Sequence, residues 1–212
     1  MGYDPNIRDD ETSFKLLTKN YRVLKRVLDT NEDLTNAISS GFRPEIAEEV
    51  IIYLHNYVSS VMSLVSHTRE LNKKLYTKAY PKALEEIQQE INNRFVNNET
   101  HQIIQGLRNY TQHRKLPIVG RAMSFNVLDN THTLKANYYL STDSLLEWDG
   151  WKPLARKTLE NMKNMTIVEQ ALENMSVDIA VNPLITEHYK QVTEFYNWLF
   201  GKRREWMFRR PK

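Results

Sequence analysis

The sequence VIIYLHNYVSSVMSLVSHTRELNKKL, residues 50–75, places its mostly apolar inward positions at spacings that alternate between four and three. These positions are Val50, Leu54, Tyr57, Val61, Leu64, Thr68, Leu71 and Leu75. The alternation is the heptad pattern of a helix that buries one stripe along its whole length. Pro44 suits the first turn of this helix, where a missing N–H has no partner to lose. The stretch therefore predicts a long helix, ended or kinked by Pro81, that is covered by another helix, a second protomer, or both.

Upstream of this helix, residues 12–29 repeat apolar side chains at helical spacing, and Thr12 or Ser13 suits the cap. Residues 1–11 are polar, so we expect a loose arm there. Residues 31–41 have the pattern of a short helix or a loop.

Downstream, two further helices are predicted over 83–95 and 101–115. Asn98 or Thr100 can cap the second by accepting from a free backbone N–H. Pro117 disfavours helical geometry in the residue before it, so the helix should end near residue 115.

After Pro117 the apolar period changes to two, which predicts a β-hairpin over 119–128 and 133–141 with a turn at Asp129-Asn130. A two-stranded hairpin is marginal alone, so it must lean on the helices. The remaining pattern predicts helices over 143–148, 151–164, 167–175 and 183–206.

The predicted fold is mostly α: an antiparallel bundle of long helices with a small β-hairpin insertion and C-terminal helices. We expect one domain over 1–212. Its subregions are a helical core at 12–116, the hairpin at 119–141, and C-terminal helices with a basic tail at 143–212.

The composition, with 41% hydrophobic and 26% charged residues among 212, is that of a globular protein. The absence of cysteine excludes disulfides, thiolate catalysis and cysteine-type metal sites. No apolar run approaches the ~20 residues that span a bilayer. The first residues lack the charged and apolar regions of a signal peptide, so we expect a cytoplasmic protein without a membrane partner.

The net charge of +3 is concentrated in the last twelve residues, which carry +5 and leave −2 for the rest. Any nucleic-acid site must therefore be local. Candidate RNA contacts in this tail are Arg203, Arg204, Arg209 and Arg210, with Trp206 and Phe208 placed to stack on bases. We favour the simpler interpretation of a helix end with solvated cations and a packed Trp206, because six basic residues are a modest patch.

The predicted 101–115 helix has an unusual polar face. Its apolar side is Ile103, Ile104, Leu107 and Tyr110. The other side carries His101, Gln105, Arg108, Asn109, Gln112 and His113. We call these six residues the polar stripe. An ordinary solvated face carries Lys and Glu, whereas Arg, His and amides bind ligands and transfer protons.

Within the stripe, an Arg is followed directly by a polar residue and, five positions after the Arg, by a His: Arg108, Asn109 and His113. This pattern, on a helix late in a helical bundle, resembles the signature of the HEPN (higher eukaryotes and prokaryotes nucleotide-binding) superfamily of ribonucleases. The resemblance covers residues 108–113 and the helical pattern around them. The hairpin is not part of that family's common core.

The resemblance implies a symmetric homodimer in which two motifs line a shared cleft and cleave RNA without a metal or other cofactor. Arg108 and His113 then take catalytic roles and Asn109 an accessory one. Such proteins commonly act as toxins or in defence against phage, controlled by an antitoxin or regulatory protein.

The chemistry fits these residue types. Cleavage by the adjacent 2′-hydroxyl needs a base, a cation on the phosphorane and an acid for the leaving 5′-oxygen. Neutral imidazole suits the base, and a guanidinium forks onto phosphate oxygens. Base and acid act on opposite sides, so two copies of His113 across a two-fold axis would supply both.

Three other interpretations stay open. Arg108 can be a surface cation and His113 a helix-end histidine that the helix dipole favours. The stripe at 101–113 can belong to a non-catalytic binding module that docks a protein or nucleotide. The heptad helix can serve oligomerisation alone in a structural subunit. Catalysis needs Arg108 and His113 exposed in one cleft near their symmetry mates.

The other titratable residues form no predicted site. His55, His67, His132 and His188 have no metal-ligand spacing. We expect His55 and His188 at the surface or packed between helices, and Asp9-Asp10-Glu11 as a solvated acidic cluster in the arm.

Overall fold

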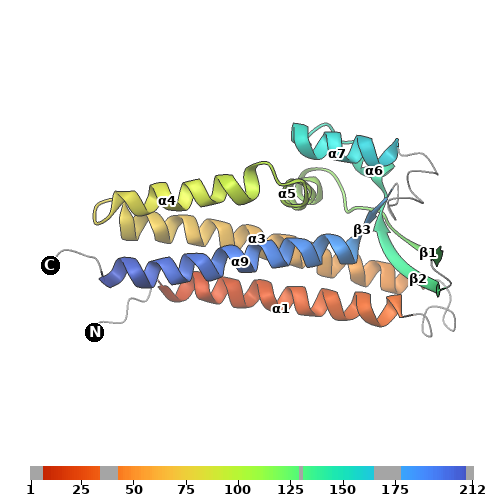
Figure 1. Cartoon of the computed structure of the whole chain (residues 1–212). Helices are drawn as coiled ribbons and strands as arrows, with labels where there is room; N and C mark the ends of the chain where they lie inside the picture. The colour runs from red at the N-terminus through yellow and green to blue at the C-terminus, as the bar shows by residue number, and fades with distance from the viewer. Residues whose placement is uncertain (1–6, 34–42, 129–130, 165–177, 209–212) are drawn as a thin grey trace.

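The structure is a computed structural model that describes residues 7–33, 43–128, 131–164 and 178–208. It is mostly helical with a small antiparallel sheet, as predicted. Three long helices run side by side along the molecule, and shorter helices and the sheet gather at one side and one end (Figure 1). The long helices are α1 (Ile7–Glu32), α3 (Pro44–Tyr76) and α9 (Val181–Phe208).

The heptad helix is α3, and its predicted stripe is buried from Val50 to Leu71, with Leu75 partly buried. It begins at Pro44, as expected from the missing N–H. α1 packs along it and α9 lies beside both, so this chain itself covers the stripe.

α1 begins at Ile7, earlier than predicted. Residues 7–11, which were predicted to belong to a loose arm, are therefore helical. The reason is a tertiary contact: Asp10 is fully buried against Arg203 of α9 and is not solvated. Most of the short segment predicted at 31–41, and all of the helix predicted at 167–175, fall outside the described residues.

The region predicted as a helix over 83–95 divides into α4 (Pro81–Ile91) and a π-helical turn, η1 (Asn92–Val96). α5 (Glu99–His113) follows, and the Asn98 Oδ1 accepts from the His101 N–H at 2.9 Å, which confirms one of the two predicted caps. α5 ends at His113, slightly before the predicted end.

The hairpin consists of β1 (Val119–Leu128) and β2 (Thr131–Leu140), with Val119 opposite Leu140. A two-residue strand that was not predicted, β3 (Ile179–Ala180), pairs with the end of β2 to give the order β1-β2-β3. The short helices α6 (Thr142–Leu146) and α7 (Pro153–Lys163) follow β2.

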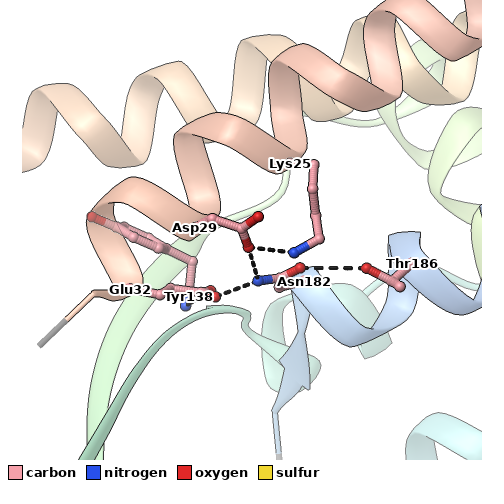
Figure 2. A network of polar contacts seen from close by, with 6 residues as sticks. All are labelled: Lys25, Asp29, Glu32, Tyr138, Asn182 and Thr186. Carbon is pink, nitrogen blue, oxygen red and sulfur yellow. Dashed lines mark hydrogen bonds and ion pairs between the residues drawn. The ribbon is translucent and has the colours of Figure 1, made fainter.

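The hairpin leans on the bundle through a polar joint at the end of α1 (Figure 2). The Glu32 carboxylate accepts from the Tyr138 backbone N–H of β2 at 3.1 Å and from Asn182 Nδ2 of α9 at 2.6 Å. Asn182 Nδ2 also lies 3.1 Å from an Asp29 oxygen. Burial raises the pKa of Glu32, and the hydrogen bond from Asn182 opposes that rise. Three elements distant in sequence are thus joined at one carboxylate.

Within the described ranges, no helix has both the length and the apolar character needed to cross a bilayer.

Candidate functional site

The helix that carries the stripe, α5, is fixed by a cluster of aromatic side chains from its C-terminal neighbours. Tyr110 O–H donates to the Ser144 carbonyl of α6 at 3.2 Å. Trp151 Nε1 donates to the Leu145 carbonyl at 2.7 Å, and its ring lies against the α5 backbone at Gly106. A Cβ at Gly106 would lie 2.1 Å from that ring. Because Gly106 has no side chain, the backbone of α5 can lie directly against the Trp151 ring.

Arg108 and Asn109 are brought together on α5. Both are half-buried, and Arg108 Nη1 donates to Asn109 Oδ1 at 3.0 Å. Over the ranges that the structure describes, Arg108 makes no ion pair, whereas Arg94 and Arg156 both contact glutamates. A neutral amide therefore orients the Arg108 guanidinium without neutralising its charge.

His113 is the last residue of α5, and its side chain is exposed. Side chains five positions apart project about 140° apart around an α-helix, so Arg108 and His113 of one chain point in different directions. The fold therefore joins Arg108 with Asn109 and leaves His113 apart from them. Within a single chain, the side chains of Arg108 and His113 therefore do not face a common site.

The polar stripe is not uniformly exposed. Gln112 and His113 face solvent, while Gln105, Arg108 and Asn109 are half-buried. His101, at the other end of the stripe, turns toward α9: its Nδ1 lies 3.2 Å from His188 Nε2, and the two rings are stacked 18° from parallel.

The hydrogen-bonded chain continues into the core. His188 Nδ1 lies 2.8 Å from the hydroxyl of Tyr57 in α3, and both side chains are 0% exposed. Burial lowers the pKa of His188 to about 3 and that of His101 to about 4, so both rings are neutral near pH 7. Burial also raises the pKa of Tyr57, which keeps its proton.

The proton positions in this chain follow from hydrogen-bond satisfaction. Within the described part of the chain, the buried Tyr57 hydroxyl has one hydrogen-bond partner, His188 Nδ1. A buried O–H needs an acceptor, so the hydroxyl donates to this nitrogen. The His188 proton then lies on Nε2 and is donated to His101 Nδ1. His101 consequently carries its own proton on Nε2. The hydrogen-bonded series Tyr57–His188–His101 thus connects α3, α9 and α5.

His188 was predicted at the surface or packed between helices, and it lies in the core between α3, α5 and α9, which confirms the second of these locations. A signal was present: His188 continues the helical spacing of Val181, Leu184, Ile185 and Val192, all of which are buried. Its partners Tyr57 and His101 are far away in sequence, and no pattern pairs them.

The predicted RNA-contacting arginines of the basic tail do not share one environment. Arg203, predicted as a candidate RNA contact, is instead 5% exposed; its Nη1 pairs with Asp10 at 2.5 Å and its Nη2 donates to Asn72 at 2.7 Å. It is not available at the surface. Arg204 is exposed, and Trp206 packs edge-on against Tyr76. Arg209 and Arg210, and the side chain of Phe208, lie outside what the structure describes.

The described residues contain no group of three or more histidine, aspartate or glutamate side chains placed to hold a metal ion. Comparison of the chain with protein-family models, with curated proteins and with solved structures finds no match. Any assignment of function therefore starts from the residues themselves.

Proposed function

We propose that the protein is a metal-independent endoribonuclease that acts as a homodimer, with Arg108 and His113 in catalytic roles and Asn109 as an accessory residue. The proposal starts from the resemblance to HEPN ribonucleases. The observation that supports it best is the state of Arg108, a guanidinium oriented by Asn109 and without an ion pair in the described ranges. Such a group retains its charge for a phosphate, onto which it can fork two hydrogen bonds.

In the proposed reaction, neutral His113 of one copy removes the proton of the RNA 2′-hydroxyl. The 2′-oxygen attacks the adjacent phosphorus, and Arg108 stabilises the charge on the phosphorane. The bond to the 5′-oxygen breaks, and protonated His113 of the second copy gives that oxygen its proton. The products are a 2′,3′-cyclic phosphate and a 5′-hydroxyl. Asn109 keeps Arg108 in position.

The surface beside His113 suits a second copy of the chain. Leu116 and Ile118 lie three and five residues after the end of α5, flank the buried Pro117, and are each 55% exposed. Large apolar side chains gathered in this way favour contact with another protein surface. If the ends of two α5 helices meet across a two-fold axis, these side chains become covered and the two copies of His113 come together.

The biological setting of the proposal comes from the resemblance alone. It is a cytoplasmic toxin or phage-defence effector whose activity an antitoxin or other regulatory protein controls.

A second function, a non-catalytic module that docks a protein or nucleotide through the stripe, is favoured by one observation. Arg108 and His113 point apart within a chain, and the His101 end of the stripe is engaged by the core. Docking needs no convergence of Arg108 and His113, whereas cleavage does.

The experiment that separates the two functions is cleavage of a mixed RNA pool in EDTA by wild type, Arg108→Ala and His113→Ala. Gln112→Ala is the control for cleavage, because Gln112 is an exposed neighbour with no proposed catalytic role. We expect wild type and the control to cut, and each catalytic variant to lose about 100-fold or more in rate. Thermal unfolding checks that all four proteins are folded.

If the catalytic variants cut as fast as wild type, the assignment of the site fails. If a folded, dimeric wild type is inert, the same substitutions are tested in cells for growth arrest or phage protection. Loss of the phenotype in both variants then favours a missing activator, and an unchanged phenotype favours the docking module.

A further inference from the structure

The outer face of α1 carries a row of cations. Residues 12–28 contain five basic residues and no acidic residue. Four of these, Lys15, Lys19, Arg22 and Arg26, are spaced by four, three and four positions, and all four are exposed. We call these four residues the basic ridge.

The ridge is straight and points directly away from the core. At this spacing the four side chains fall within an arc of about 60° and extend over about 16 Å along the helix axis. The opposite face of α1 holds Leu17, Leu24 and Leu28, which are fully buried. The apolar face of the helix is thus committed to the bundle, and its charged face is left to solvent.

The charges of the ridge are not neutralised by the protein. In the part of the chain that the structure describes, none of the four makes an ion pair. The fifth basic residue of the segment, Lys25, differs, since it pairs with Asp29 at the polar joint. Four like charges at neighbouring positions of one helix face repel one another and destabilise the free protein. A bound polyanion removes this repulsion.

We infer that the basic ridge binds the phosphate backbone of a nucleic acid without reading its sequence. A straight row of cations matches a linear polyanion, which carries one negative charge per phosphate. The ridge contains no aromatic residue to stack on bases, so it positions a strand and does not select one. A lipid surface suits it less well, because a helix that lies on a membrane inserts its apolar face, and that face of α1 is buried.

The ridge is separate from the proposed nuclease site. Figure 1 shows α1 along the lower side of the bundle and α5 above it, beyond α3 and α9. Binding by the ridge therefore does not depend on cleavage. If the protein is a ribonuclease, the ridge anchors its substrate at a distance from the cut.

The test uses the full chain and a fluorescein-labelled single-stranded DNA 20-mer, which has no 2′-hydroxyl and cannot be cut by the proposed chemistry. Fluorescence anisotropy between 50 and 300 mM NaCl gives the affinity and its salt dependence. Each phosphate neutralised on a single strand contributes about −0.7 to the slope of log K against log salt, so four contacts contribute about −2.8.

The ridge variant is K15E/K19E/R22E/R26E, and the control K74E/K78E/K82E/K157E makes the same change in net charge at exposed lysines elsewhere. The neutral K15Q/K19Q/R22Q/R26Q is tested beside them in case charge reversal impairs folding, which thermal unfolding reports. We expect both ridge variants to lose affinity at least 10-fold and most of the salt slope, and the control to keep both.

Equal loss in the control and the ridge variants would overturn the inference in favour of general electrostatic attraction, and so would absence of DNA binding by wild type. Phosphatidylcholine vesicles with and without phosphatidylserine form the second arm. Ridge-dependent binding to the anionic vesicles without binding to DNA would overturn it in favour of a lipid surface. If the cleavage and cell experiments reject the proposed nuclease while the ridge still binds DNA, only the proposed function is refuted.

Discussion

His188 and His101 are histidines whose protonation the fold opposes, and this makes stability depend on pH. Their pKa values are lowered to about 3 and about 4, while an unfolded chain returns them to about 6.5. Below pH 6.5 the unfolded chain gains protons that the folded protein refuses. Their stabilising contribution is therefore complete above pH 6.5 and falls as the pH drops toward 4.

We expect the free energy of unfolding to fall between pH 6.5 and 4, with His188 alone contributing up to about 1.4 kcal/mol per pH unit. Urea denaturation at pH 7 and pH 5 measures this. His188→Gln, which can still accept from the Tyr57 hydroxyl, should weaken the dependence on pH. An identical dependence in the two proteins would show that His188 titrates normally in the folded state.

The buried pair of Asp10 and Arg203 gives a second prediction for single residues. Asp10→Ala leaves the Arg203 guanidinium buried without its counter-charge and should cost about 3–5 kcal/mol in stability. Arg204→Ala, at an exposed neighbouring position, should change it by less than about 0.5 kcal/mol. Guanidinium denaturation compares the two variants, and equal effects would contradict the role given to the pair.

For single residues, the sequence shows which functional groups lie at a local spacing, but it does not show which residues distant in sequence contact one another. The spacing of Arg108, Asn109 and His113 is visible in the sequence. The pairing of Asp10 with Arg203 joins opposite ends of the chain, and local pattern carries no information about it. The same limit hid the contact between His188 and Tyr57.

At the scale of whole helices, replacing a glycine by alanine should have opposite effects on stability in α9 and α5. A helix normally gains about 0.5–1 kcal/mol when Gly is replaced by Ala. In α9 the space beside Gly201 is open, so Gly201→Ala should stabilise the protein by about that amount. In α5 a Cβ at Gly106 would meet the Trp151 ring, so Gly106→Ala should destabilise it by about 1–3 kcal/mol.

Thermal unfolding of these two variants measures whether α5 is held by close approach to Trp151. An increase in melting temperature for both would mean that α5 has room to adjust and that the aromatic cluster does not fix the site.

The elements with strong periodicity were predicted well, because the heptad of α3, the Pro44 start and the Asn98 cap act locally. Boundaries set by tertiary contact were not, as the early start of α1 at Ile7 shows. β3 has two residues, too few for any period, and forms only because β2 offers its edge.

At the level of the molecule, the sequence predicts a helical bundle with a hairpin but not which helices touch. The stripe of α3 indicated that something covers it, and only the fold shows that α1 and α9 of the same chain do so. This leaves the surface after α5, with Leu116 and Ile118, for the proposed contact between copies.

The double variant Leu116→Asp/Ile118→Asp should therefore form folded monomers, because both side chains are exposed and their loss leaves the core intact. Its ribonuclease activity should fall with its dimer content. Sedimentation velocity and RNA cleavage measure the two properties together. A variant that stays dimeric, or a monomer that cuts at the wild-type rate, would refute this interface.

In the proposed dimer, two copies of His113 serve one site as base and acid, and a heterodimer with a single His113 tests this arrangement. Wild-type and His113→Ala chains carrying different tags are co-purified, and cleavage of RNA in EDTA is compared with that of the wild-type dimer. We expect the heterodimer to retain at most about 1% of the wild-type activity, because either the base or the acid is missing from the shared site. Half of the wild-type activity would show that each chain cuts alone and would contradict it.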